Sequence, residues 1–130
     1  MGTLSAFPSD SDAHIGWFHD LAAEVSAGRC ELDSVSREHL IQFVENHLPG
    51  HPFSGSESEA DVLAIIRDLR ANELAWNQAL QAAILRADRA FRGEDEPTAR
   101  QELEQFSREC PWRFFSEVAI DQASQYQALT

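Results

Sequence analysis

The chain has 130 residues, of which 43% are hydrophobic and 25% are charged, and this balance predicts one globular domain that can bury a core. All ten basic residues are arginines, and 22 acidic residues give a net charge of −12. Such a charge disfavours direct binding to nucleic acid or to an anionic membrane and favours a basic protein partner. Acidity that serves solubility alone is the alternative, with equal weight.

Residues 1–11 are expected to form a flexible leader because they are small and polar and include Pro8. They lack the basic and apolar regions of a secretory signal. No apolar run approaches the roughly 20 residues that cross a bilayer. The two cysteines, Cys30 and Cys110, are expected to be free thiols, since a disulfide framework needs more of them. These features together predict a cytoplasmic protein.

Residues 12–130 are predicted to form a single all-helical domain. Asp12 is expected to cap a first helix over 13–27, with apolar residues every three or four positions and Gly28 as a left-handed end. A second helix is expected over 36–47, before a Pro-Gly pair that a helix cannot continue through. No segment alternates apolar and polar residues as a strand does, so we expect no sheet.

Residues 57–92 carry a helical pattern that neither glycine nor proline interrupts, after a capping box that begins at Ser56. One helix of about 35 residues would be about 50 Å long, which is long for a domain of this size. Glu73 interrupts the apolar stripe and Asn72 is a good N-cap residue, so we expect a break or a sharp bend near 71–73. One continuous helix, in a homodimer, is the alternative.

A turn then leads to a helix that a second capping box opens at Thr98. Cys110 precedes a proline and is expected to form a corner, because a residue before proline avoids helical angles. A last helix is predicted over 111–127, with Trp112 and Phe115 holding it against the other helices. The predicted architecture is an all-α compact bundle of five to six helices.

The sequence lacks the motifs of common catalytic and cofactor sites, among them phosphate loops, HExxH and calcium loops. His47 and His51 have the i, i+4 spacing of zinc ligands, but the Pro-Gly pair between them prevents helical geometry. Cys110 lies near a helix N-terminus, which lowers a thiol pKa, yet burial as a small hydrophobe is the favoured interpretation. We expect no enzyme, metal or cofactor, with a metal protein or enzyme using these residues and His39 as an alternative.

By elimination, the sequence favours a small acidic protein-binding module that neutralises or regulates a partner. A bacterial immunity or inhibitor-type protein that blocks a basic toxin or enzyme is the leading hypothesis. A nucleic-acid mimic with acids along one elongated face, a regulatory adaptor and a homodimeric structural protein are the alternatives. Exposed aromatic residues ringed by acids would form the binding surface. The candidate residues are Trp17, Glu57, Glu59, Asp61, Glu94, Asp95, Glu96, Arg113 and Phe114.

Two groups of charged residues also have a structural interpretation. The acids of 57–61 and 94–96 lie at predicted helix N-termini or in a turn, where carboxylates complement the helix dipole or stay solvated. That interpretation is favoured for them. Arg86, Arg89 and Arg92 form a basic stripe, expected first as a solvated helix face paired with nearby acids. Binding to a carboxylate-bearing partner is the alternative.

Overall fold

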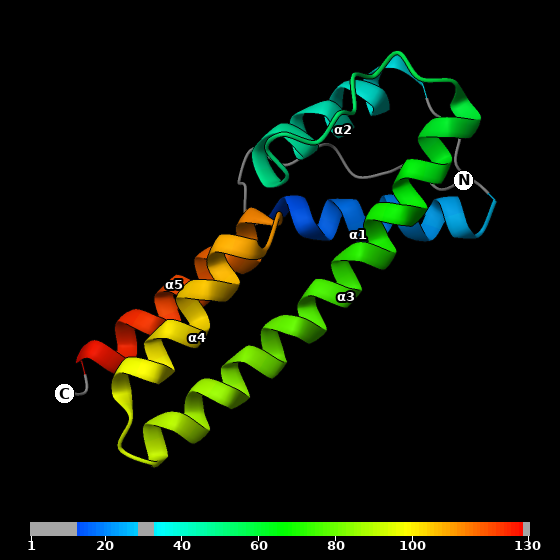
Figure 1. Ribbon diagram of the computed structural model, residues 1–130. Helices are drawn as coiled ribbons and strands as arrows, with labels where there is room; N and C mark the ends of the chain where they lie inside the picture. The colour runs from blue at the N-terminus through cyan, green and yellow to red at the C-terminus, as the bar shows by residue number, and fades with distance from the viewer. Residues whose placement is uncertain (1–12, 29–32, 129–130) are drawn as a thin grey trace. The chain divides into compact units, whose positions relative to one another are not determined.

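The structure is a computed structural model, and it describes residues 13–28 and 33–128. Over these residues it contains five helices and no strand, which confirms the all-α prediction (Figure 1). The helices are α1 (His14–Ser26), α2 (Ser34–His47), α3 (Glu59–Arg92), α4 (Glu96–Glu109) and α5 (Arg113–Ala128). The chain divides into two compact units, one ending at Asn72 and the other starting at Glu73. The single domain expected over 12–130 stays a prediction.

The ends of α1 and α2 are set by local hydrogen bonds. After α1, Gly28 has a φ of 72° and donates its N–H to the Val25 carbonyl, as a left-handed helix end requires. Before α2, the Asp33 carboxylate accepts the Ser36 N–H at 2.7 Å, so this helix begins two residues earlier than predicted. This hydrogen bond lowers the pKa of Asp33. The predicted cap Asp12 lies outside the described residues.

Aromatic rings pack α1 against α2 in the N-terminal unit. Phe18 stacks on Phe43 with 4.7 Å between ring centroids, and Trp17 lies 6.1 Å from the same ring. All three side chains are buried. Aromatic pairs of this kind contribute about 0.5–1.5 kcal/mol beyond the area they bury, so these rings fix the pairing of the two helices.

The loop between α2 and α3 is held by hydrogen bonds to Arg37 and Glu57. The Arg37 guanidinium donates to the carbonyls of Gly55 and Glu57 at 3.2 and 2.6 Å. The Glu57 carboxylate accepts the N–H groups of Ser54 and Gly55, and the first of these bonds is the main cause of its lowered pKa. Gly55 has a φ of 89°, and a Cβ at this position would collide with the Ile41 side chain.

Helix α3 is continuous, so the break expected near 71–73 is wrong. It is capped by Ser58, whose Oγ accepts the Asp61 N–H at 3.2 Å, and not by the predicted Ser56. Its buried positions are separated by alternate steps of four and three residues, with half-buried Trp76 in the same series, which is the pattern of a helix with one apolar seam. The buried residues of this seam are Val62, Ile66, Leu69, Glu73, Leu80, Ala83 and Ala87.

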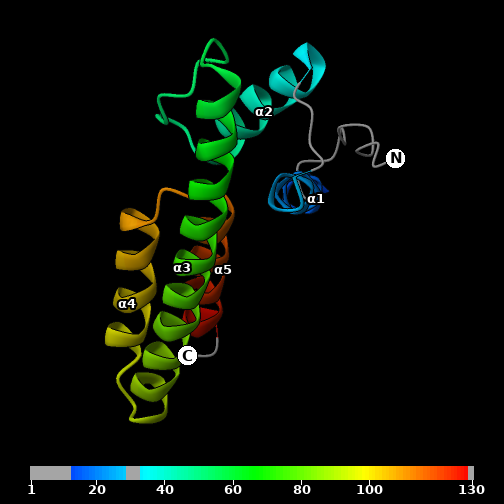
Figure 2. The same cartoon turned by 90° about the vertical axis from the view of Figure 1, so that its right-hand side faces the viewer.

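In the C-terminal unit, the second half of α3, α4 and α5 lie side by side, and each runs antiparallel to the next along the chain (Figures 1 and 2). Helix α4 begins earlier than predicted because Asp95 is its cap. The Asp95 carboxylate accepts the Thr98 N–H at 3.2 Å and the Thr98 hydroxyl at 2.7 Å. Thr98 therefore lies inside the first turn, and the capping box expected there is wrong.

Cys110 takes the predicted extended form in the corner between α4 and α5, but α5 starts at Arg113, two residues later than predicted. Cys110 has extended angles, with φ −75° and ψ 125°, directly before the proline. The Ser116 hydroxyl donates to the Cys110 carbonyl at 3.1 Å and holds the corner against α5. Trp112 is completely buried and Phe115 nearly so, as expected for residues that anchor the last helix.

Candidate partner-binding groove

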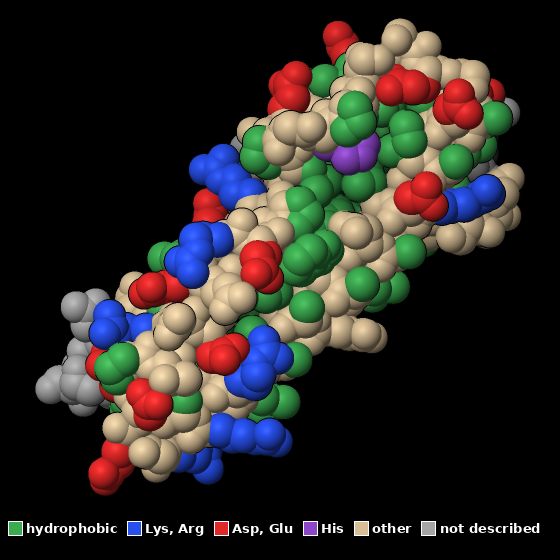
Figure 3. Space-filling model, viewed as in Figure 1, with side chains coloured by type: hydrophobic (Ala, Val, Ile, Leu, Met, Phe, Trp, Pro, Cys, Tyr) green, Lys and Arg blue, Asp and Glu red, His purple; other side chains and the backbone are tan. Residues whose placement is uncertain are grey.

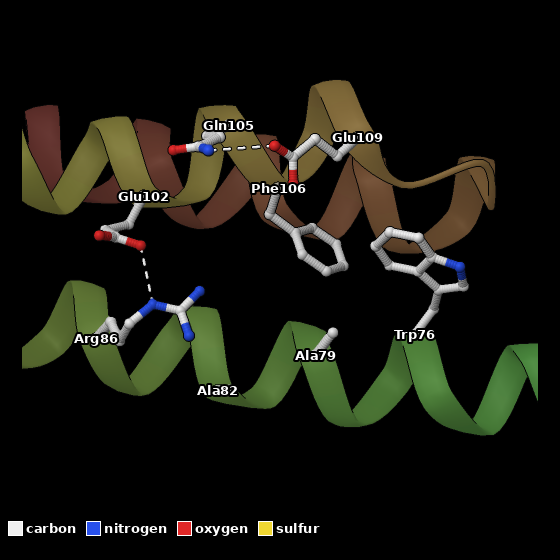
Figure 4. A pocket seen from close by; sticks show the side chains of 8 residues that line it. All are labelled: Trp76, Ala79, Ala82, Arg86, Glu102, Gln105, Phe106 and Glu109. Carbon is white, nitrogen blue, oxygen red and sulfur yellow. Dashed lines mark hydrogen bonds and ion pairs between the residues drawn. The ribbon is translucent and has the colours of Figure 1, made fainter.

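A cavity of about 200 Å³ opens between α3 and α4, entirely within the C-terminal unit (Figure 4). The residues that line it are three or four apart along each helix, with one neighbouring pair, so each helix presents one face to it. Helix α3 contributes Trp76, Ala79, Ala82 and Arg86, and α4 contributes Glu102, Gln105, Phe106 and Glu109. We call this cavity the α3–α4 groove.

The two ends of the groove differ in chemistry. At one end the rings of Trp76 and Phe106 meet edge to face, with 5.8 Å between centroids. At the other end Arg86 Nε donates to Glu102 Oε2 at 2.9 Å and crosses from α3 to α4 (Figure 4). Space remains between these ends because α3 places only the small side chain of alanine there, at Ala79 and Ala82.

The groove carries a net negative charge, because its lining holds two carboxylates and one guanidinium. Gln105 Nε2 donates to Glu109 Oε1 at 3.1 Å, and this bond holds the Glu109 carboxylate along α4 (Figure 4). Among the described residues, no hydrogen bond reaches the second oxygen of Glu102 or of Glu109, and Glu109 makes no ion pair. Each of these two carboxylates therefore keeps one acceptor oxygen.

This lining contains no cysteine, histidine, serine or threonine, and its charged groups are two carboxylates and one guanidinium. The volume lies below the roughly 300–1,000 Å³ of sites for drug-sized ligands. An aromatic end, a small apolar floor and two acceptors fit one side chain of a partner better than a whole metabolite.

The predicted acidic candidates of the N-terminal unit are spread along a loop and a helix start. Glu57 holds the loop before α3, as described above, and Glu59 and Asp61 are exposed in the first turn of α3. There the carboxylates complement the positive end of the helix dipole. Glu59 and Asp61 therefore lie where the structural interpretation expected them, Glu57 instead binds backbone N–H groups of the loop, and partner binding by all three stays a prediction.

The acids of 94–96 also have structural roles. Glu94 has a φ of 64° in the turn after α3, Asp95 caps α4, and Glu96 forms an ion pair with Arg100 at 2.6 Å. None of them lines the groove. Asp95 therefore fixes the start of α4 and Glu96 pairs within that helix, and the role of all three acids in partner binding stays a prediction.

The aromatic candidates differ in exposure. Phe114 is 37% exposed and packs edge to face on Phe115, so the expectation of an exposed aromatic residue is met there. Trp17 is only 3% exposed, so Phe114 and not Trp17 is the exposed one of the two aromatic candidates. The Trp17 ring packs between α1 and α2. Arg113, beside Phe114, forms an ion pair with Glu117 at 2.9 Å.

The environment of Cys110 opposes thiolate formation. The thiol is buried, and this burial raises its pKa above the ordinary value. Its Sγ donates to the Trp112 carbonyl at 3.7 Å. Burial as a small hydrophobe, the favoured prediction for a free Cys110, is confirmed. Cys30 lies outside the described residues.

The structure brings together two histidines whose proximity the sequence did not predict. His14 Nδ1 and His47 Nε2 lie 3.1 Å apart, and both rings are buried between α1 and α2. One nitrogen donates and the other accepts, so the pair forms one hydrogen bond when both rings are neutral. His51 Nδ1 accepts the Phe53 N–H at 3.2 Å. Over the residues that the structure describes, no group of three or more His, Cys, Asp or Glu side chains is arranged to hold a metal ion.

Sequence reasoning missed the groove, although one signal for it was present. Arg86 belongs to the basic stripe, and its pairing with Glu102 confirms the expected pairing with acids for this arginine. Arg92 likewise pairs with Asp88 at 2.9 Å. The sequence did not indicate which helix supplies the acid that pairs with Arg86. The ion pair between residues 86 and 102 forms only because α4 folds back on α3.

Comparisons with family models, curated proteins and solved structures give no match for this chain. In the described ranges, none of the helices combines the length and the apolar character needed to cross a membrane. The groove and the charge of the chain are therefore the features from which a function is proposed below.

Proposed function

We propose that the protein binds a basic partner protein at the α3–α4 groove and thereby neutralises or regulates it. The observation that supports this proposal is the union of two aromatic rings and two carboxylates in one open cavity. The net charge of −12 attracts a basic partner over a distance and speeds the encounter, and salt weakens this effect. The aromatic rings then supply contact area from which water is excluded.

The form that we propose is an inhibitor or immunity-type protein of the bacterial cytoplasm, which blocks a basic toxin or enzyme. A cavity that joins aromatic and acidic side chains supports contact with a basic protein surface, which blocking requires. The nucleic-acid mimic, which requires acids gathered along one face, stays a prediction; on the face drawn in Figure 3 acidic and basic side chains are interspersed. The regulatory adaptor and the homodimer stay predictions.

Capture of partners with matched charge variants tests this proposal. Tagged protein is incubated with a lysate of its source organism at low and at high salt, and the bound proteins are identified by mass spectrometry. The wild type is compared with the groove variant Glu102→Gln/Glu109→Gln and with the control Glu45→Gln/Glu104→Gln. Both variants lose the same charge, but Glu45 and Glu104 lie outside the groove lining.

We expect one stoichiometric basic protein that the wild type and the control retain at low salt and the groove variant loses. Equal retention by both variants would place binding elsewhere on the surface and contradict the proposal. Recovery of the tagged chain alone would contradict it in favour of a homo-oligomer, which a mass measurement in solution would then detect.

A further inference from the structure

We infer that the α3–α4 groove takes up a single arginine side chain of the partner. This inference depends on the proposed function, since it names the group by which the basic partner is recognised. It follows from three properties of the groove, namely its apolar surface, its acceptor oxygens and its charge.

The apolar surface fits the stem and the flat face of an arginine. Ala79 and Ala82 leave room for methylene groups, and half-exposed Trp76, packed on the buried ring of Phe106, presents aromatic surface at the end of this space (Figure 4). A guanidinium stacks on aromatic rings and is attracted to their negative faces. A cavity of about 200 Å³ has space for one such side chain and not for a strand or a helix.

The hydrogen-bonding groups of the groove call for a donor. Glu102 uses one carboxylate oxygen for Arg86, and Glu109 uses one for Gln105, which leaves one acceptor oxygen on each. Guanidinium carries five N–H donors and no acceptor, so it can donate a charge-assisted hydrogen bond to an oxygen that remains. Lysine offers a compact point charge instead, and citrulline, the neutral analogue of arginine, has similar shape without the charge.

The charges of the groove are balanced by one additional cation. Glu102 and Glu109 carry two negative charges, and Arg86 supplies one positive charge. An incoming guanidinium therefore makes the lining neutral. Glu109 is its main partner, because Glu102 already pairs with Arg86 and, among the described residues, Glu109 has only the neutral Gln105.

Titration with small arginine analogues, followed by NMR, tests this inference on the full chain. The probes are the Nα-acetyl N-methylamides of arginine, lysine and citrulline. Trp17 and Trp112 are buried and Trp76 is half-exposed, so the indole N–H resonances separate the groove from the cores. We expect the arginine probe to shift the Trp76 indole and the Gln105 side-chain amide in a saturable way, and the lysine and citrulline probes to bind at least fivefold more weakly.

Single substitutions on α4 locate the binding. Glu109→Gln should weaken arginine binding at least fivefold, whereas Glu104→Gln, with the same charge change on the same helix, should leave it within twofold of the wild type. Similar shifts with citrulline, or equal loss in the two variants, would overturn the inference because binding would then be unspecific or purely long-range.

The two experiments separate the inference from the proposed function. If a basic protein is lost from the groove variant but the arginine probe does not bind, the arginine inference is wrong and the proposed function remains. If the arginine probe binds at Trp76 but the groove variant and the control capture the same proteins, the groove recognises arginine and the proposed function is wrong.

Discussion

Truncation of Trp112 should be strongly destabilising. Its indole is completely buried and lies 6.2 Å from the Phe115 ring in the corner before α5. A buried indole removes about 200 Å² from water, which corresponds to about 5 kcal/mol at about 25 cal/mol per Å². Measured losses for Trp→Ala in protein cores are about 3–5 kcal/mol, since part of the cavity relaxes. We therefore expect Trp112→Ala to lower the free energy of unfolding by about 4 kcal/mol.

Urea unfolding followed by circular dichroism at 222 nm measures this loss without relying on tryptophan fluorescence. With a urea dependence of about 2 kcal/mol per M, the midpoint should fall by about 2 M. Phe114→Ala is the matched control, because this neighbouring ring is 37% exposed and its removal should cost less than about 1 kcal/mol. If Trp112→Ala loses no more than the control but fails to bind a partner, Trp112 belongs to an interface and the packing argument is wrong.

Three further predictions follow from local geometry. In a Cys30→Ser background, Cys110 should react with a thiol reagent at neutral pH far more slowly than free cysteine, because burial raises its pKa; a rate equal to that of free cysteine contradicts this. Asp33 has a lowered pKa, so its stabilising effect is present above an unfolded pKa of about 3.9 and is lost as the pH falls through the folded value. The difference in Tm between the wild type and Asp33→Asn should therefore shrink from pH 6 to pH 3, and a constant difference would refute the linkage. Gly55→Ala should lower Tm more than Gly50→Ala, since both positions have positive φ but only the first lacks space for a Cβ; equal losses would show that the loop can move aside.

The sequence predicted the fold class well because helix periodicity, proline and glycine act locally. The corner at Cys110 and the left-handed Gly28 needed only the neighbouring residues. Caps were predicted less well. Both Ser56 and Ser58 can cap a helix, and the choice of Ser58 depends on the loop, where Arg37 reaches the Gly55 carbonyl from α2. That contact depends on tertiary structure, so a local motif cannot specify it.

The candidate site was predicted poorly for a related reason. Acidic runs such as 94–96 are conspicuous in a sequence because caps and turns concentrate carboxylates at adjacent positions. The groove is formed by residues from two helices, and Arg86 and Glu102 meet only after α4 reverses direction. A single sequence indicates that Arg86 will pair with an acid but not which helix supplies that acid, whereas a cap has at least a local motif.

The continuity of α3 shows how weak a local break signal can be. Asn72 is less favourable than alanine inside a helix by at most about 0.7 kcal/mol. A break would instead leave as many as four N–H and four C=O groups on its two sides in need of new caps. The helix therefore continues through Asn72, and it is the packing of the chain, rather than the helix, that divides there into two units.

Ala71→Gly tests this continuity directly. Ala71 is exposed in the interior of α3, so a glycine there should lower the free energy of unfolding by about 0.8–1.0 kcal/mol, as in any exposed helix interior. Ala64→Gly, at another exposed position of the same helix, is the matched control and should cost the same. Helical Cα chemical shifts should continue through residues 69–75 in the wild type. If Ala71→Gly is neutral while Ala64→Gly is costly, and the Cα shifts at 71–73 fall to coil values, then the helix is broken in solution and the break indicated by Asn72 is real.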